Sequence, residues 1–183
     1  PDWSPDGKWI AYSDWNDSSD IWIIPVTGGE PRRVTTDPAR DILPRWSPDG
    51  KRILFVSTRG SGQRNLWTIS PTGGAKTLFP VTSDADSVGN NIVNWSPDGT
   101  EIVYSAIKDG ELNLWAISAQ GTNPRQITDV PGMSWDPDWS PDGKWIAYNY
   151  VTGEEAMGDA DLWIVSADGG EGRLLLNQAG PQW

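Results

Sequence analysis

The chain has 183 residues, of which 37% are hydrophobic, and it carries a formal net charge of −11. A chain of this length can bury one substantial core, and its negative charge argues against a nucleic-acid partner, which normally meets a basic surface. The absence of both Cys and His excludes disulfides, thiolate metal sites and nucleophiles that rely on a histidine base. No apolar run approaches the roughly 20 residues of a membrane-spanning helix, so we expect no membrane insertion.

A five-residue phrase, Trp-Ser-Pro-Asp-Gly, occurs four times along the chain, and a fragment of a fifth copy closes it. The copies start at Trp3, Trp46, Trp95 and Trp139, and the fragment ends at Trp183. Successive Trp residues are 43, 49, 44 and 44 positions apart, a period typical of one four-stranded propeller blade. We therefore expect a single propeller domain over residues 1–183, with blades near 3–45, 46–94, 95–138 and 139–182.

Each repeat is predicted to open with an inner strand that ends at the Trp and turns back through Ser-Pro-Asp-Gly. Pro presets φ near roughly −65° at the first central position of such a turn, and Gly takes the left-handed conformation that returns the chain to the ladder. A second strand of β-branched and aromatic residues follows, as in Lys8–Tyr12 and Lys51–Phe55.

A third strand is predicted at a short polar residue followed by an aliphatic residue and Trp, as in Asp20-Ile21-Trp22 and Asn113-Leu114-Trp115. It leads through a Gly-containing turn to an outer strand such as Arg32–Thr35 or Arg125–Thr128, which we expect to be polar because it is the edge of the blade. No segment shows helical periodicity. The fold class is therefore all-β, a β-propeller of four-stranded antiparallel blades with four blades present.

The 13 Trp residues are explained mainly by the repeats. Nine of them occupy two repeated positions, and we expect these nine in the core because a buried Trp hides roughly 150 to 250 Å²; they are Trp3, Trp46, Trp95, Trp139, Trp183, Trp22, Trp67, Trp115 and Trp163. Trp9 and Trp145 share a third position and are also expected in the core. Only Trp15 and Trp135 have no counterpart in other repeats, so they are the Trp residues to consider for ligand contact.

The run from Trp3 to Thr35, Trp-Ser-Pro-Asp-Gly-Lys-Trp-Ile-Ala-Tyr followed by Asp-Ile-Trp and Gly-Gly-Glu-Pro-Arg-Arg-Val-Thr, resembles the TolB-like (WD-repeat-like) propeller repeat. The resemblance extends over essentially the whole chain. It implies a propeller that binds proteins or peptides in the periplasm or outside the cell. The same repeat also forms the gating propellers of prolyl-oligopeptidase-type and tricorn-type peptidases.

Propellers of this resemblance usually have more than four blades. An open array of four would leave two Trp-rich faces unpaired, which soluble monomers avoid. Three arrangements are open: part of a larger propeller, a closed four-bladed ring, or a half-propeller completed by a second copy as a homodimer. We favour the first, because both ends of the chain fall inside the same predicted strand.

Variation between repeats indicates where a ligand would bind. The residue before the repeated Trp changes from copy to copy, being Asp2, Arg45, Asn94, Asp138 and Gln182. The connections Thr36–Pro44, Thr82–Val93 and Asp129–Pro137 add further polar and aromatic groups, namely Asp41, Asn90, Asn91, Trp135 and Asp136. Such loops carry function in many folds, although solvated strand ends would give the same pattern. The predicted binding residues are Asp2, Arg45, Asn94, Trp135, Asp136 and Asp138.

Clustered carboxylates raise the question of a metal. One group contains Glu154, Glu155, Asp159 and Asp161, and another contains Asp84 and Asp86. Oxygen-rich loops can bind calcium, but neither group has the spacing of a calcium loop, and a solvated acidic loop explains both. We predict no cofactor, with calcium as the one ion to test, and assign the Ser of each Ser-Pro-Asp-Gly to its turn.

Three functions remain open at this stage. The first is a non-catalytic module that binds a protein or peptide. The second is an accessory propeller of a prolyl-oligopeptidase-type serine peptidase whose catalytic domain lies outside this chain. The third is a structural half-propeller that assembles with itself.

Overall fold

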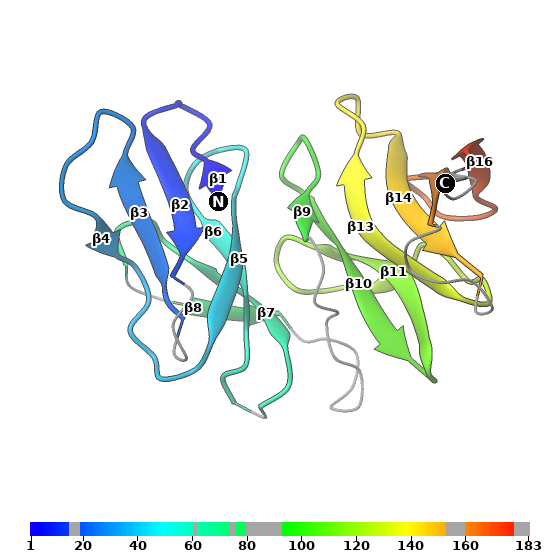
Figure 1. Cartoon of the computed structure of the whole chain (residues 1–183), viewed down its shortest axis with the longest axis horizontal. Coiled ribbons are helices and arrows are strands. Elements are labelled where there is room, and N and C mark those ends of the chain that lie inside the picture. Colours follow the sequence, from blue (N-terminus) through cyan, green and yellow to red (C-terminus); the bar gives the residue numbers. More distant parts are fainter. Residues whose placement is uncertain (15–18, 61, 74–75, 80–92, 153–159, 178–183) are drawn as a thin grey trace, which may run out of the picture. The chain divides into compact units, whose positions relative to one another are not determined.

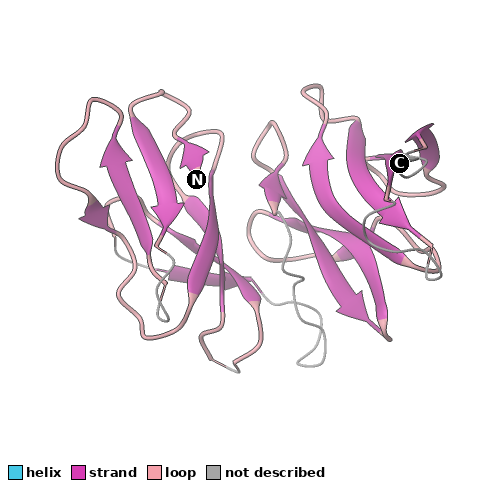
Figure 2. Ribbon diagram, in the orientation of Figure 1, coloured by secondary structure: helices cyan, strands magenta, loops and turns pink. Residues whose placement is uncertain are grey.

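The computed structural model describes residues 1–14, 19–60, 62–73, 76–79, 93–152 and 160–177, and within these ranges the regular structure is entirely β-strand (Figures 1 and 2). The chain divides into two compact units, residues 1–88 with 120–122 and residues 89–119 with 123–183. No helix capable of crossing a membrane is found in the described part. Trp15, Trp183, Gln182, Asn90, Asn91, Asp84, Asp86, Glu154, Glu155 and Asp159 lie outside the described residues.

The first unit contains two four-stranded sheets, each antiparallel and in sequential order. Blade 1 comprises β1 (Asp2–Trp3), β2 (Trp9–Ser13), β3 (Ile21–Pro25) and β4 (Arg32–Arg33). Blade 2 comprises β5 (Asp41–Trp46), β6 (Ile53–Ser57), β7 (Asn65–Ile69) and β8 (Lys76–Phe79).

The second unit repeats this arrangement. Blade 3 comprises β9 (Asn94–Trp95), β10 (Glu101–Lys108), β11 (Glu111–Ser118) and β12 (Arg125–Gln126), and blade 4 comprises β13 (Met133–Trp139), β14 (Trp145–Val151), β15 (Asp161–Ser166) and β16 (Arg173–Leu176). Blades 3 and 4 are joined by one parallel pair, Leu112 of β11 with Met133 of β13. Their strands therefore form one eight-stranded sheet.

The Ser-Pro-Asp-Gly turns form as predicted. In the first copy Gly7 has φ +68° and its N–H donates to Ser4 O at 2.8 Å. The Ser4 hydroxyl donates to Asp6 Oδ1 at 2.6 Å and accepts from the Trp9 N–H at 2.9 Å. Asp6 Oδ1 also accepts from the Lys8 N–H at 3.1 Å. Ser and Asp therefore satisfy the turn's backbone donors, which explains why both recur.

The blades pack through two chemically different faces. Aliphatic residues of blade 1, including Ala11, Ile21 and Val34, pack against Trp46 and Phe55 of blade 2. In the second unit the aliphatic face of blade 3, with Val103, Leu114, Ala116 and Ile127, meets Ile146, Tyr148, Trp139 and Trp163 of blade 4. Within each unit, the first blade thus presents an aliphatic face to the aromatic side chains of the second.

The repeated Trp residues differ in burial. Trp9, Trp22, Trp67, Trp139 and Trp163 are half-buried, and the prediction of a core position is wrong at two others. Trp46, Trp95 and Trp115 are 8%, 7% and 7% exposed, but Trp3 is 58% and Trp145 is 43% exposed. Trp3 belongs to the aromatic face of blade 1 and Trp145 to the aliphatic side of blade 4, and neither face is covered by a sheet of its own unit. Trp3 and Trp145 are exposed because no sheet of their own unit packs on the face that carries them.

The outer strands also differ from expectation. Arg32 and Arg33 are exposed, but the residues just beyond them, Val34 and Thr35, are buried at 7% and 0% exposure. The end of the outer strand therefore turns into the core. In blade 4 the corresponding strand is apolar and exposed, with Leu174, Leu175 and Leu176 at 41%, 49% and 53%.

Candidate recognition surface

The four predicted residues that precede the repeated Trp occupy one equivalent position of the inner strands. In every blade this residue pairs across the ladder with the same position of the second strand. The pairs are Asp2 with Ala11, Arg45 with Leu54, Asn94 with Val103 and Asp138 with Ala147. Because side chains alternate across a strand, this position faces the same way as the aliphatic residues. In blades 1 and 3 it therefore points toward the second blade of the same unit.

Two of these residues bind the next inner strand of their own unit. Asp2 Oδ2 accepts a hydrogen bond from the backbone N–H of Trp46 at 2.6 Å. Asn94 Nδ2 donates to the backbone oxygen of Pro137 at 2.9 Å and to Asp138 Oδ1 at 3.3 Å. Asp2 and Asn94 therefore hold consecutive inner strands together, a role that the sequence did not reveal.

The other two residues are placed differently. Arg45 is half-buried and its Nη1 donates to the oxygen of its neighbour Pro44 at 3.2 Å. Asp138 is exposed, because it lies on the uncovered side of blade 4. Of the four, Asp138 is the most exposed, although its Oδ1 accepts the hydrogen bond from Asn94.

A bulge interrupts the inner strand three residues before the repeated Trp in blades 2 and 4. Leu43 has φ +57° and Asp136 has φ +51°, and the register shifts between Ile42 and Arg45 and between Trp135 and Asp138. Each left-handed residue precedes a Pro. A bulge bends the strand and redirects its side chains, and bulges are common beside functional sites. Trp135 and Asp136, both half-buried, lie on this feature.

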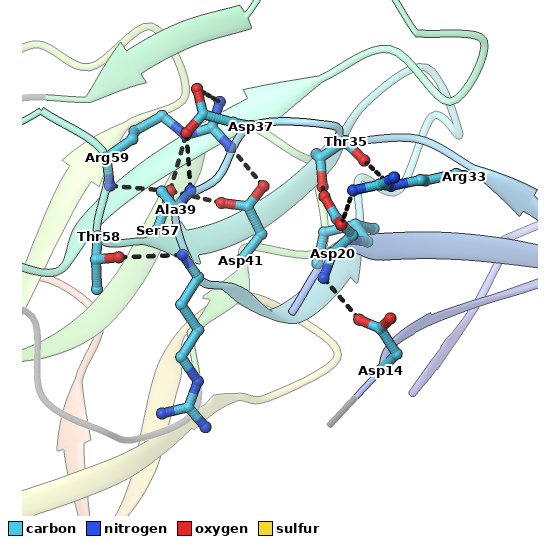
Figure 3. Close-up of polar contacts among 12 residues, drawn as sticks. Asp14, Asp20, Arg33, Thr35, Asp37, Ala39, Asp41, Ser57, Thr58 and Arg59 are labelled. Atoms are coloured by element: carbon cyan, nitrogen blue, oxygen red, sulfur yellow. Dashed lines mark hydrogen bonds and ion pairs between the residues drawn. The ribbon is translucent and has the colours of Figure 1, made fainter. Parts of the chain in front are cut away.

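The connection before β5 ends in a buried ion pair (Figure 3). Asp41 is completely buried; it pairs with the Arg59 guanidinium and accepts from the Ser57 hydroxyl at 2.6 Å. Arg59 Nε donates to Ser57 Oγ at 2.8 Å, and the guanidinium lies 4.9 Å from the Trp67 ring centre. Asp41, considered above as a group offered to a ligand, is thus engaged inside the blade, where it fixes the start of the inner strand.

A second polar contact ties the outer strand to the third strand. Thr35 Oγ1 accepts from the Ile21 N–H at 2.9 Å and donates to Asp20 Oδ1 at 3.1 Å, while Arg33 pairs with Asp20 (Figure 3). Blade 3 repeats the arrangement with Thr128 and Asn113, at 3.0 Å. The polar residue before the third strand is therefore structural in both units.

Blade 4 replaces the ion pair with aromatic side chains. At the position of Asp41 it has Ser134, which is buried with no hydrogen-bond partner for its hydroxyl in the described part of the chain. Opposite Ser134, Tyr150 donates to the oxygen of Pro131 at 2.6 Å and meets the Trp163 ring edge-on at 5.3 Å. The sequence contained a signal for this difference, because Asp41 and Ser134 occupy equal distances before the repeated Trp.

A small cavity of about 210 Å³ adjoins these aromatic residues, lined by Tyr148, Tyr150, Trp163, Glu171, Gly172 and Val130. Burial, with a smaller contribution from Tyr150, raises the pKa of Tyr148 to about 12. Trp135 lies on the opposite side of the sheet from Tyr150, because it pairs with the neighbouring residue Asn149. The cavity and the Trp135 strand are therefore separate features of blade 4.

The described residues contain no group of three or more His, Cys, Asp or Glu side chains arranged to hold a metal ion. Asp161, one of the residues considered for calcium, lies in β15, whereas its expected companions fall outside the described ranges.

Residues 1–112 match the family model of the Tricorn protease N-terminal beta propeller domain. The chain belongs to this propeller family. The membership confirms the all-β propeller fold and the TolB-like resemblance predicted from the sequence.

Several known proteins are similar to this propeller. It is 27% identical over 186 residues to the uncharacterized protein Atu1656 of Agrobacterium fabrum, covering 100% of this chain and 59% of that protein. It is 31% identical over 140 residues to dipeptidyl-peptidase 5 of Porphyromonas gingivalis, covering 69% of this chain and 20% of the peptidase. The structure of a putative TolB from Agrobacterium tumefaciens superposes with a TM-score of 0.79 at 25% identity, covering 96% and 64% of the two chains. The propeller spans less than two thirds of each of these proteins.

Proposed function

We propose that this propeller is a non-catalytic module that binds a protein or peptide through the uncovered side of its strand β13. The observation that carries the proposal is the composition of the bulge, where Trp135, Asp136 and Asp138 lie within four residues. Aromatic side chains supply a disproportionate share of binding energy at interfaces. The two carboxylates favour a partner that combines basic and apolar side chains.

The similarity to a TolB structure supports a binding role, and the similarity to a dipeptidyl-peptidase supports a peptide as the bound species. By the same resemblance we place the protein in the periplasm or outside the cell. Fractionation of cells that express the complete tagged reading frame tests this location, and a cytoplasmic fraction would refute it.

The binding test uses two defined peptides, acetyl-Lys-Leu-Lys-Leu-amide and its counterpart with Glu in place of Lys. Titration followed by the indole N–H signals in NMR should show binding of the basic peptide. Trp135→Ala and Asp138→Asn should weaken that binding about tenfold or more, the size of an interface hot spot. Trp3→Ala is the matched control, because Trp3 is an exposed Trp of the other unit. Binding that survives Trp135→Ala unchanged would refute the site.

A second candidate is the accessory propeller of a serine peptidase, favoured by the match of this chain to one fifth of the dipeptidyl-peptidase. In that case a Gly-x-Ser-x-Gly motif followed by Asp and His should occur downstream in the same reading frame. Sequencing of the flanking coding region decides the matter, since a stop codon soon after Trp183 would exclude it.

A further inference from the structure

The Ser-Pro-Asp-Gly turns of blades 1 and 2 border a recess of about 650 Å³ within the first unit. Its lining includes the side chains of Trp9, Ile23 and Trp46 and the basic residue Arg32. None of these residues belongs to β13, so the recess is distinct from the surface proposed above.

The second unit contains the corresponding recess, of about 450 Å³, between the turns of blades 3 and 4. There Glu101 occupies the position of Trp9, and Arg125 occupies the position of Arg32. Arg125 Nη2 pairs with Glu101 Oε2 at 2.8 Å, and its Nη1 donates to the backbone oxygen of Ala167 at 2.8 Å. In this unit the chain supplies a carboxylate of its own to the Arg.

In the first unit that carboxylate is replaced by an aromatic ring. The Arg32 guanidinium lies 5.7 Å from the centre of the Trp9 ring, and Arg32 is exposed. Among the described residues no carboxylate pairs with it. The counterpart of Ala167 is Pro71, which lines the recess. The recess therefore combines an Arg in the position that binds Glu101 elsewhere with the aromatic surface of Trp9.

The acidic residues at the border of the recess do not neutralise Arg32. Asp6 accepts from the Ser4 hydroxyl at 2.6 Å and lies 3.6 Å from Lys8 Nζ. Asp49 accepts from the Ser47 hydroxyl at 2.6 Å and lies 3.8 Å from Lys51 Nζ. Each turn thus carries its own counter-charge, and Arg32 remains as the cation in excess.

We propose that this recess binds an apolar carboxylate. The carboxylate pairs with Arg32 as Glu101 pairs with Arg125, and the apolar group lies against Trp9 and Trp46. Arg is suited to this role because its planar guanidinium matches a carboxylate with two parallel donors. Two sources share this chemistry, the C-terminal residue of a peptide and a free organic acid.

The test uses N-acetyl-leucine and acetyl-Ala-Ala-Leu, each compared with its own C-terminal amide. Binding is followed through the indole N–H signal of Trp9 in NMR. Both acids should bind about tenfold more tightly than their amides, as expected for a charge-assisted contact. A tripeptide acid that binds more tightly than N-acetyl-leucine identifies a peptide terminus as the ligand. Equal affinities identify a small organic acid, and both results support the proposal.

Three variants locate the effect. Arg32→Gln should make each acid bind no better than its amide. Trp9→Glu, in which binding is followed through the indole N–H of Trp46 in the same recess, should re-create the pairing seen between Glu101 and Arg125, and so weaken acid binding about tenfold. Arg125→Gln is the matched control in the other unit and should leave acid binding unchanged.

The proposal is overturned by equal affinity of acid and amide, by acid binding that survives Arg32→Gln, or by the absence of any Trp9 shift at roughly 10 mM ligand, beyond the weak limit of specific binding. Because Arg32 is exposed, Arg32→Gln keeps the test decisive even if Trp9→Glu does not fold.

Discussion

The carboxylate of Asp2 lies 2.6 Å from the backbone nitrogen of Trp46, so the inner strand of blade 1 holds the inner strand of blade 2. Trp46 is 8% exposed, and its N–H would have no replacement partner from solvent. A position that varies from repeat to repeat can thus be buried and structural in one blade and exposed in another.

Replacement of Asp2 by Ala should destabilise the protein by about 1–3 kcal/mol, the cost of leaving a buried donor unsatisfied. Urea unfolding followed by Trp fluorescence measures the change. Asp138→Ala is the control at the equivalent position of blade 4, and it should cost less than about 0.5 kcal/mol because Asp138 is exposed. Equal losses for the two variants would contradict the assignment.

Asp41→Ala should be among the most damaging changes in the first unit, costing about 3–5 kcal/mol, because it leaves the Arg59 guanidinium buried without its carboxylate. The double variant Asp41→Ala with Arg59→Met should recover part of the loss, since no unpaired charge remains. A double-mutant cycle from urea unfolding gives the coupling. Strictly additive losses would show that the two side chains do not act as a pair.

Gly172→Ala should destabilise the second unit, because a Cβ at this position would overlap the Tyr148 hydroxyl. The expected loss is about 1–3 kcal/mol, typical of overpacking. Tyr148→Phe removes the overlapping oxygen, so the double variant should be more stable than Gly172→Ala alone. Thermal melts of the three variants test this, and a double variant no better than Gly172→Ala would refute the contact.

Acid should lower the stability of the fold by protonating the Asp residues of the Ser-Pro-Asp-Gly turns. The Ser hydroxyl, followed by a backbone N–H, holds the pKa of each of Asp6, Asp49, Asp98 and Asp142 below its ordinary value of 3.8. A depressed folded-state pKa stabilises the fold above the unfolded value, and this contribution is lost as the pH falls through the folded one. Stability should therefore decline below about pH 4.

Carbon-detected NMR titration of the carboxyl groups measures these values directly. Ser140→Ala should move the pKa of Asp142 upward and leave that of Asp49 in place. An unchanged Asp142 pKa would show that the hydroxyl is not the main cause.

The uncovered faces should make the chain associate with itself. Trp3 is 58% exposed where Trp46 is 8%, and Leu175 is 49% exposed where its counterpart Val34 is 7%. Sedimentation should show a mass that rises with concentration. Trp3→Glu and Leu175→Glu should each be monomeric alone, yet form a complex when mixed, because each retains the face that the other lacks. A single-chain mass for the unmodified protein at all concentrations would contradict this.

The sequence was sufficient for the strands and turns because Pro, Asp and Gly act locally. The turn around Gly7 depends on five consecutive residues, and its geometry follows from them alone. The uncovered positions of Trp3 and Trp145 were missed because burial depends on what lies across the blade face, which no local pattern records.

For the candidate binding residues, too, local features could be predicted from the sequence and contacts between distant residues could not. That Asp2 and Asn94 bind the next strand, and that Asp41 is paired with Arg59, could not be predicted, since the partners are 18 to 44 positions away in the chain. The bulge at Asp136 had a visible sign in the Pro that follows both Leu43 and Asp136. That this Pro marks a bulge became clear only from the register of the paired strands.

The packing inside each unit has a consequence for self-association. If copies associate through the same kind of contact, an aliphatic blade face should meet an aromatic one, so the copies should join front to back. Such heterologous contacts either close into a ring, when the rotation per step divides the circle, or continue as an open filament. A partner that covers Trp3 in this way should present an aliphatic blade face, and the angle between successive copies should then set their number.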